Sequence, residues 1–142
     1  MSGPALNVKL ECLQGVDFSE TLLFFNAPTS GSKEVSDLVP LDFTTATAAR
    51  LMVKPSSDAT QAAILSLTLG AGLAFTAGTI TPGPATPGYN NGIIITVTRA
   101  QSLAANAGAT ISAYYDLLVD WANGTTTIVA RGTFNIAATG TR

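Results

Sequence analysis

Short runs of β-branched and aromatic residues, separated by Gly, Pro and Asn, recur along almost the whole chain. This alternation predicts strands, which we place at residues 8–13, 18–25, 49–54, 63–69, 73–76, 92–98, 110–121 and 125–137. One segment has a helical composition, residues 99–107 (RAQSLAANA), with Thr98 placed to cap it and Gly108 to end it. The pattern predicts an all-β fold, a single antiparallel β-sandwich of the jelly-roll or immunoglobulin type with one short connector helix.

The strand pattern shows no break in composition, so 142 residues predict one domain, residues 1–142. We expect a flexible N-terminal segment, residues 1–7, and two extended loops, residues 26–42 and 82–91. Connections of this length are either tolerated surface loops or carry contacts. Under the second reading, the loop residues we expect at an interface are Val35, Leu38, Pro82, Pro84, Pro87 and Tyr89.

Asn123-Gly124, between two strand patterns, predicts a hairpin with a two-residue type I′ turn. That turn sets the register and places Asp116 opposite Arg131, a charge pair that stabilises the sheet. The same register places Leu118 opposite Val129 on the outer face. That apolar pair is either a lone surface contact or part of a face covered by a second protomer.

Composition argues against several functional classes. The chain has no histidine, which removes the commonest general base and a favoured metal ligand. It carries no nucleotide-binding or hydrolase motif, so we expect neither an enzyme nor a cofactor. The seven basic residues are scattered, which argues against nucleic acid, and no stretch approaches the roughly 18 apolar residues of a membrane span. Cys12 has no partner for a disulfide and is expected to be a small buried hydrophobe.

Two further constellations could carry binding. Asp37 and Asp42 in the first loop could hold calcium, but they lack the convergent spacing of a calcium loop. Trp121 at the hairpin end could stack on a sugar, as in a carbohydrate-binding module, although a Trp at a strand end more often caps the core. Carboxylate pairs such as Asp116 with Asp120 are too far apart along a strand for glycoside hydrolysis.

The order of several short motifs resembles small β-sandwich virion proteins of tailed bacteriophages. The motifs are residues 15–18 (GVDF), 41–44 (LDFT) leading into 48–54 (AARLMVK), 115–119 (YDLLV), 131–134 (RGTF) and the terminal residues 141–142 (TR). The likeness spans residues 15–142. The 41–44 turn lacks the Gly of the family pattern, and residues 26–40 form a longer insertion, which affects loop geometry more than fold.

The resemblance implies a virion structural protein. Such modules are similar either to cement (decoration) proteins seated on the capsid or to baseplate and tail-fibre adaptors. Charged residues make up only 11% of the chain, against about 25% in a typical soluble domain, which suits a surface covered by partners. We therefore expect a capsid cement protein, made in the host cytoplasm, that forms a homodimer and binds the major capsid protein.

Overall fold

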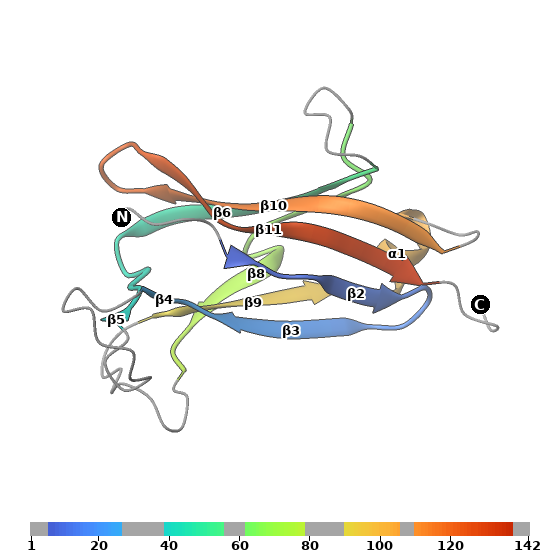
Figure 1. Cartoon of the computed structure of the whole chain (residues 1–142), viewed down its shortest axis with the longest axis horizontal. Helices are drawn as coiled ribbons and strands as arrows, with labels where there is room; N and C mark the ends of the chain where they lie inside the picture. The colour runs from blue at the N-terminus through green and yellow to red at the C-terminus, as the bar shows by residue number, and fades with distance from the viewer. Residues whose placement is uncertain (1–5, 27–38, 56–61, 79–89, 106–109, 138–142) are drawn as a thin grey trace.

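The computed structural model describes residues 6–26, 39–55, 62–78, 90–105 and 110–137, and within them the protein is almost entirely β-structure (Figure 1). The strands are β1 (Leu6–Asn7), β2 (Leu10–Leu13), β3 (Phe18–Leu23), β4 (Phe25–Asn26), β5 (Val39–Pro40), β6 (Ala46–Lys54), β7 (Leu65–Leu69), β8 (Gly72–Thr76), β9 (Gly92–Val97), β10 (Ile111–Trp121) and β11 (Thr126–Ala137). The described helix is α1 (Arg99–Ala105). The expected all-β class is confirmed.

The strands form one continuous sheet in the order β1-β11-β10-β6-β7-β8-β9-β3, with β2 also paired to β11, and β4 pairs separately with β5. The sheet curves back on itself and is nearly closed into a barrel. Figure 1 shows β6, β10 and β11 on one side, facing β3, β8 and β9 on the other. The pairings β1–β11, β2–β11 and β7–β8 are parallel, so the sheet is mixed and the expectation of purely antiparallel pairing is wrong.

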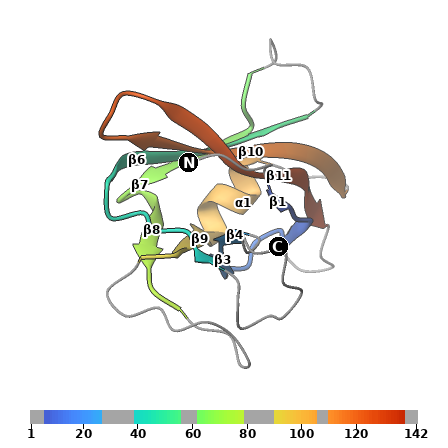
Figure 2. The ribbon, with the colours of Figure 1, turned by 60° about the vertical axis from the view of Figure 1, so that its left-hand side comes forward.

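A sharp corner between β7 and β8 carries the chain from one side of the barrel to the other (Figure 2). Thr68 and Ala71 exchange both backbone hydrogen bonds across the corner, at 3.1 and 2.8 Å. Gly72 has a φ of +103° there, and a Cβ at this position would lie 2.6 Å from the Leu67 side chain. The corner therefore depends on a glycine, both for its backbone conformation and for the close approach of Leu67.

The core lies between the two sides of the barrel and follows the two-residue period of the strands. Along β10 the side chains of Ala113, Tyr115, Leu117 and Val119 are buried, and the intervening residues are exposed or half-buried. The core also contains the buried side chains of the neighbouring strand β6 and of β9 on the other side: Ala49, Leu51, Val53, Ile93, Ile95 and Val97.

Helix α1 begins as predicted, at the residue after Thr98. The Thr98 hydroxyl accepts a hydrogen bond from the Gln101 N–H (3.2 Å), and the Gln101 side chain accepts one from the Thr98 N–H (2.9 Å). This reciprocal pair is a capping box. The Ser102 hydroxyl also accepts a hydrogen bond from the Gly15 N–H at 2.9 Å, which ties the helix to the β2–β3 turn. The expected helix end at Gly108 lies outside the described residues.

The expected flexible N-terminal segment and the two expected extended loops are shorter than the sequence suggested. Leu6–Asn7 is strand β1, paired with β11, and so does not belong to a flexible N-terminal segment. Val39–Pro40 pairs with Phe25–Asn26, which ties together the two ends of the first loop. Asn91, at the end of the second loop, is buried, and its side chain exchanges hydrogen bonds with the Gly78 backbone at 2.9 and 3.0 Å. The loop residues between these anchors lie outside the described part of the chain.

Candidate functional site

The β10–β11 hairpin turns at Asn123 and Gly124, as predicted, but the loop has three residues and the type I′ assignment is wrong. The Gly124 N–H donates to the Trp121 carbonyl (3.0 Å), and the Trp121 N–H donates to the Thr125 carbonyl (2.8 Å). Gly124 has a φ of +87°, while no non-glycine residue in the described ranges has a positive φ. A type I′ turn needs positive φ at both central residues, so this loop is instead a tight turn closed by a left-handed glycine.

The extra loop residue is compensated by a β-bulge further along the hairpin. The register shifts between Leu117 and Leu118, and Val129 is left without a partner on β10. Val129 is therefore turned into the core, where it is 3% exposed, and Leu118 lies opposite Ile128. The predicted Leu118–Val129 pair on the outer face is wrong. Beyond the bulge the predicted register holds, and Asp116 lies opposite Arg131.

The outer side of β6, β10 and β11 carries an apolar patch, which we call the outer-face patch: Met52, Leu118 and Ile128, with Tyr114 further along β10. The first three are half-buried and Tyr114 is 44% exposed. Ile128 lies directly opposite Leu118, and Met52 lies opposite Asp116, the residue that precedes Leu118 by two on the same face. Backbone pairing on both sides of β10 holds these side chains on a rigid surface.

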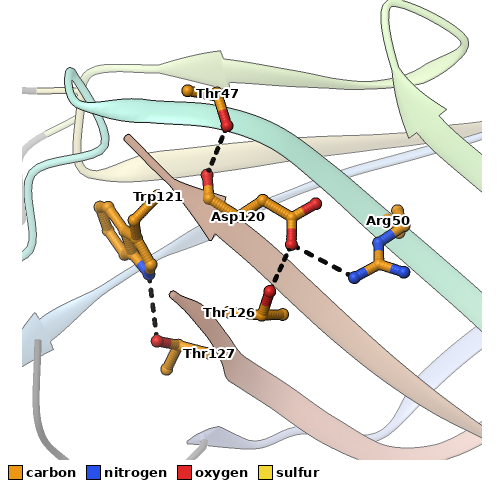
Figure 3. Close-up of polar contacts among 6 residues, drawn as sticks. All are labelled: Thr47, Arg50, Asp120, Trp121, Thr126 and Thr127. Carbon is orange, nitrogen blue, oxygen red and sulfur yellow. Dashed lines mark hydrogen bonds and ion pairs between the residues drawn. The ribbon is translucent and has the colours of Figure 1, made fainter. Parts of the chain in front are cut away.

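Two ion pairs lie on the same face as the outer-face patch, among its apolar side chains. The Asp120 carboxylate accepts hydrogen bonds from the Arg50 guanidinium (3.2 Å) and the Thr126 hydroxyl (2.6 Å), as Figure 3 shows. The Asp116 carboxylate lies 3.3 Å from the Arg131 guanidinium. Both pairs are substantially exposed, so their contribution to stability is small. Asp116 lies between Met52 and Arg131, and Arg50 lies opposite Leu118, so charged and apolar side chains alternate across this face.

The ionisable groups inside the barrel are held in their neutral forms. Burial, with a smaller contribution from Glu11, raises the pKa of the Cys12 thiol to about 11. Burial and the Glu20 charge raise the pKa of Tyr115 to about 12, and its hydroxyl donates to the Val8 carbonyl at 2.7 Å. The expectation that Cys12 is a buried small hydrophobe is confirmed by its 2% exposure. Neither group is poised to act as a nucleophile near neutral pH.

Asp42 is the residue of the 41–44 turn that the resemblance singled out, and its carboxylate organises that turn. It accepts hydrogen bonds from the Thr44 N–H (3.1 Å), the Thr44 hydroxyl (2.9 Å) and the Asn90 N–H (3.3 Å). Desolvation opposes ionisation, but these hydrogen bonds outweigh it and lower the pKa of the carboxyl below its ordinary value. In the described ranges no three His, Cys, Asp or Glu side chains converge as metal ligands, and Asp37 lies outside them.

Trp121 caps the end of the core, which was the more common of the two roles weighed for it. Its indole stacks on Phe43, with ring centroids 5.8 Å apart and planes at 19°. Its Nε1 donates to the Thr127 hydroxyl at 3.0 Å, as Figure 3 shows. The ring also lines a cavity of about 460 Å³ at the hairpin end, together with residues of the 41–45 segment and the turn.

Of the predicted interface residues, Leu118 lies on the outer face and Val129 lies in the core. The other six, Val35, Leu38, Pro82, Pro84, Pro87 and Tyr89, lie outside the described residues. Met52 and Ile128 were missed as members of the patch. The strict alternation of β6 could have identified Met52, because Leu51 and Val53 on either side of it are the buried positions. Ile128 could not have been found, since its side depends on the bulge.

A scan against protein-family models finds no family that matches the chain, and a search of curated proteins finds no similar sequence. No helix in the described residues is long and apolar enough to cross a membrane.

Proposed function

We propose that the chain is a virion structural protein of a tailed bacteriophage that acts as a cement protein on the capsid surface. The observation that carries the proposal is the outer-face patch. Met52, Leu118 and Ile128 gather on the solvent side of a continuous sheet, where a strand normally presents polar residues. Together with the low charge of the whole chain, this patch is suited to contact with another protein.

The proposed partner at the patch is a second copy of the chain. A two-fold interface uses the same surface on both subunits. A patch centred on β10 can face its own copy while the charges among its apolar side chains stay paired, as Arg50–Asp120 and Asp116–Arg131. The dimer would bridge neighbouring copies of the major capsid protein. A protein that binds only the assembled shell stabilises that shell by mass action.

The type of β-fold and the position of the protein in the virion are part of the same proposal. The resemblance to phage virion modules supports a sandwich of the jelly-roll or immunoglobulin type, synthesised in the host cytoplasm and seated on the capsid. Residues 1–7, 26–40 and 82–91 are proposed to contact the capsid. The alternative within the same class is a baseplate or tail-fibre adaptor, which the resemblance supports equally.

The patch is tested with one leucine exchanged on it and one exchanged away from it. Leu118→Lys places a charge in the centre of the patch, whereas Leu13→Lys alters a leucine that is 45% exposed at the end of β2. We expect the wild type and Leu13→Lys to be dimers by light scattering, and Leu118→Lys to be a monomer with a similar unfolding midpoint. A monomeric wild type at high concentration would refute the dimer.

Imaging of whole virions tests the location. A cement protein is found on heads, including tailless heads, and its removal lowers the temperature at which heads lose DNA. Purification with tails and absence from tailless heads would replace the cement role with the adaptor role. Absence from every virion component would refute both.

A further inference from the structure

A cavity lies at the end of the barrel that Trp121 caps. The cavity has a volume of about 460 Å³ and is lined by Leu41, Asp42, Thr45, Trp121, Ala122, Asn123 and Thr125. This volume lies in the range of about 300–1,000 Å³ typical of small-molecule sites. The two segments that form it are tied together by the Ala122 N–H, which donates to the Thr45 carbonyl at 3.0 Å.

The apolar part of the cavity is an aromatic platform that is already fixed. The Trp121 indole is held by the hydrogen bond to Thr127 (Figure 3) and by its stack on Phe43. Phe43 is in turn stacked on Phe75, with centroids 5.2 Å apart, and packed edge-on against Phe24. Because the ring is ordered before any ligand arrives, binding on it loses little side-chain entropy.

The polar part of the cavity offers both acceptors and donors. The side-chain oxygen of Asn123, Oδ1, accepts hydrogen bonds from the Thr125 N–H (3.1 Å) and the Thr125 hydroxyl (2.6 Å), which fixes the side-chain amide. The Asn123 amide NH₂ has no hydrogen-bond acceptor in the described part of the chain. The Asp42 carboxylate keeps a lone pair beyond its three hydrogen bonds, and the Thr45 hydroxyl adds a group that can both donate and accept.

We propose that this cavity binds a neutral sugar unit of a glycan. A pyranose ring has one face of C–H groups that packs on an indole, and hydroxyls that both donate and accept at its edge. Those features match the Trp121 platform and the polar groups of Asp42, Thr45 and Asn123. Among the described residues that line the cavity, Asp42 is the one with an ionisable side chain, and a carboxyl group with a pKa at or below its ordinary value is charged near neutral pH. An anionic sugar or a phosphate would therefore be repelled. The site does not depend on the virion role.

The single tryptophan makes the site directly observable, since Trp121 supplies all indole fluorescence of the chain. The probes are lactose, maltotriose, mannotriose and chitotriose, with sialyllactose as the anionic counterpart of lactose. We expect at least one neutral sugar to change the Trp121 emission saturably. Sialyllactose should bind at least about 10-fold more weakly than the best neutral probe. No saturable change with any neutral probe, or equal affinity for sialyllactose and that probe, would overturn the proposal.

Thr45→Val locates the site without disturbing the core. The substitution keeps the shape of an exposed side chain and removes one hydroxyl from the cavity, whereas Trp121→Ala would also remove the cap on Phe43. We expect Thr45→Val to weaken binding of the best neutral probe about 5- to 10-fold, a change appropriate to one lost hydrogen bond, with an unchanged unfolding midpoint. Thr68→Val, exposed on β7 away from the cavity, is the control. Unchanged affinity in Thr45→Val would show that the sugar binds elsewhere.

Discussion

Gly132 lies where the N-terminal segment runs alongside β11, and replacing it with alanine should be unusually costly. Its φ is +151°, a conformation that side chains rarely adopt. A Cβ built on it lies 2.4 Å from the Val8 carbonyl oxygen, and ordinary contact begins at 3.4 Å. Because the obstacle is backbone and not a flexible side chain, the Val8 peptide has to move by about 1 Å.

That movement disturbs two hydrogen bonds. The Val8 N–H donates to the Arg131 carbonyl at 3.0 Å, and the Tyr115 hydroxyl donates to the Val8 carbonyl at 2.7 Å. Each contributes about 1 kcal/mol, and the backbone conformation adds about 1–2 kcal/mol. Alanine also restricts the unfolded chain, which offsets about 0.5 kcal/mol. We expect Gly132→Ala to lower the free energy of unfolding by about 3 kcal/mol, or the Tm by roughly 10 °C.

Urea unfolding followed by Trp121 fluorescence measures the change, and Gly70→Ala is the matched control. Gly70 has a φ of +85°, but a Cβ there would meet nothing within 4 Å, so it reports the backbone strain alone. Tyr115→Phe should cost less in the Gly132→Ala background than in the wild type, because the hydrogen bond to Val8 is already weakened there. If Gly132→Ala costs no more than Gly70→Ala, the clash with Val8 is not the cause.

Three further predictions concern single interactions. The pKa of the Cys12 thiol is raised from 9.0 to about 11 in the folded protein. The stabilisation that comes from keeping this thiol protonated is complete below pH 9 and is lost as the pH rises to 11, because the unfolded chain ionises first. Cys12→Ala should reduce the loss of unfolding free energy measured across that interval. Thr98→Ala removes the cap on the Gln101 N–H and should cost about 1 kcal/mol in urea unfolding, and rescue by Thr98→Ser but not by Thr98→Val would identify the hydroxyl as the cause. Asp120→Asn removes the exposed ion pair with Arg50 and should cost less than about 1 kcal/mol; a larger loss in 1 M salt than in 0.1 M salt would contradict a screened surface pair.

The sequence was sufficient to predict strands where alternation and burial coincide. Residues 113–119 alternate between buried and less buried positions on β10, as do residues 49–54 on β6, so the two-residue period alone identifies their inward face. The way the strands are joined was not predictable. The parallel β7–β8 corner depends on the glycine conformation at Gly72, and the parallel β1–β11 and β2–β11 pairs join segments distant in the sequence.

The hairpin gives a sharper example of what local signals determine. The two-residue turn was wrong by one residue and the bulge was not foreseen, yet Asp116 still lies opposite Arg131. The two differences cancel because the buried face of β10 has to meet the buried face of β11, whatever the turn does. A bulge at Val129 is how the chain reconciles a three-residue loop with that requirement. Candidate sites that depend on the bulge, such as Ile128 in the patch, therefore could not be predicted from the turn motif.

The same strand that positions the outer-face patch also positions the cavity, and this separates the two proposed activities physically. Leu118 is directed outward, between Ile128 and Arg50 on the neighbouring strands. Trp121, three residues on, is directed inward and stacks on Phe43. Because opposite faces of one strand are involved, Leu118→Lys should abolish dimers without changing sugar binding, and Thr45→Val should weaken sugar binding without changing dimers. If either substitution affected both measurements, the rigid strand β10 would not be keeping the two surfaces independent.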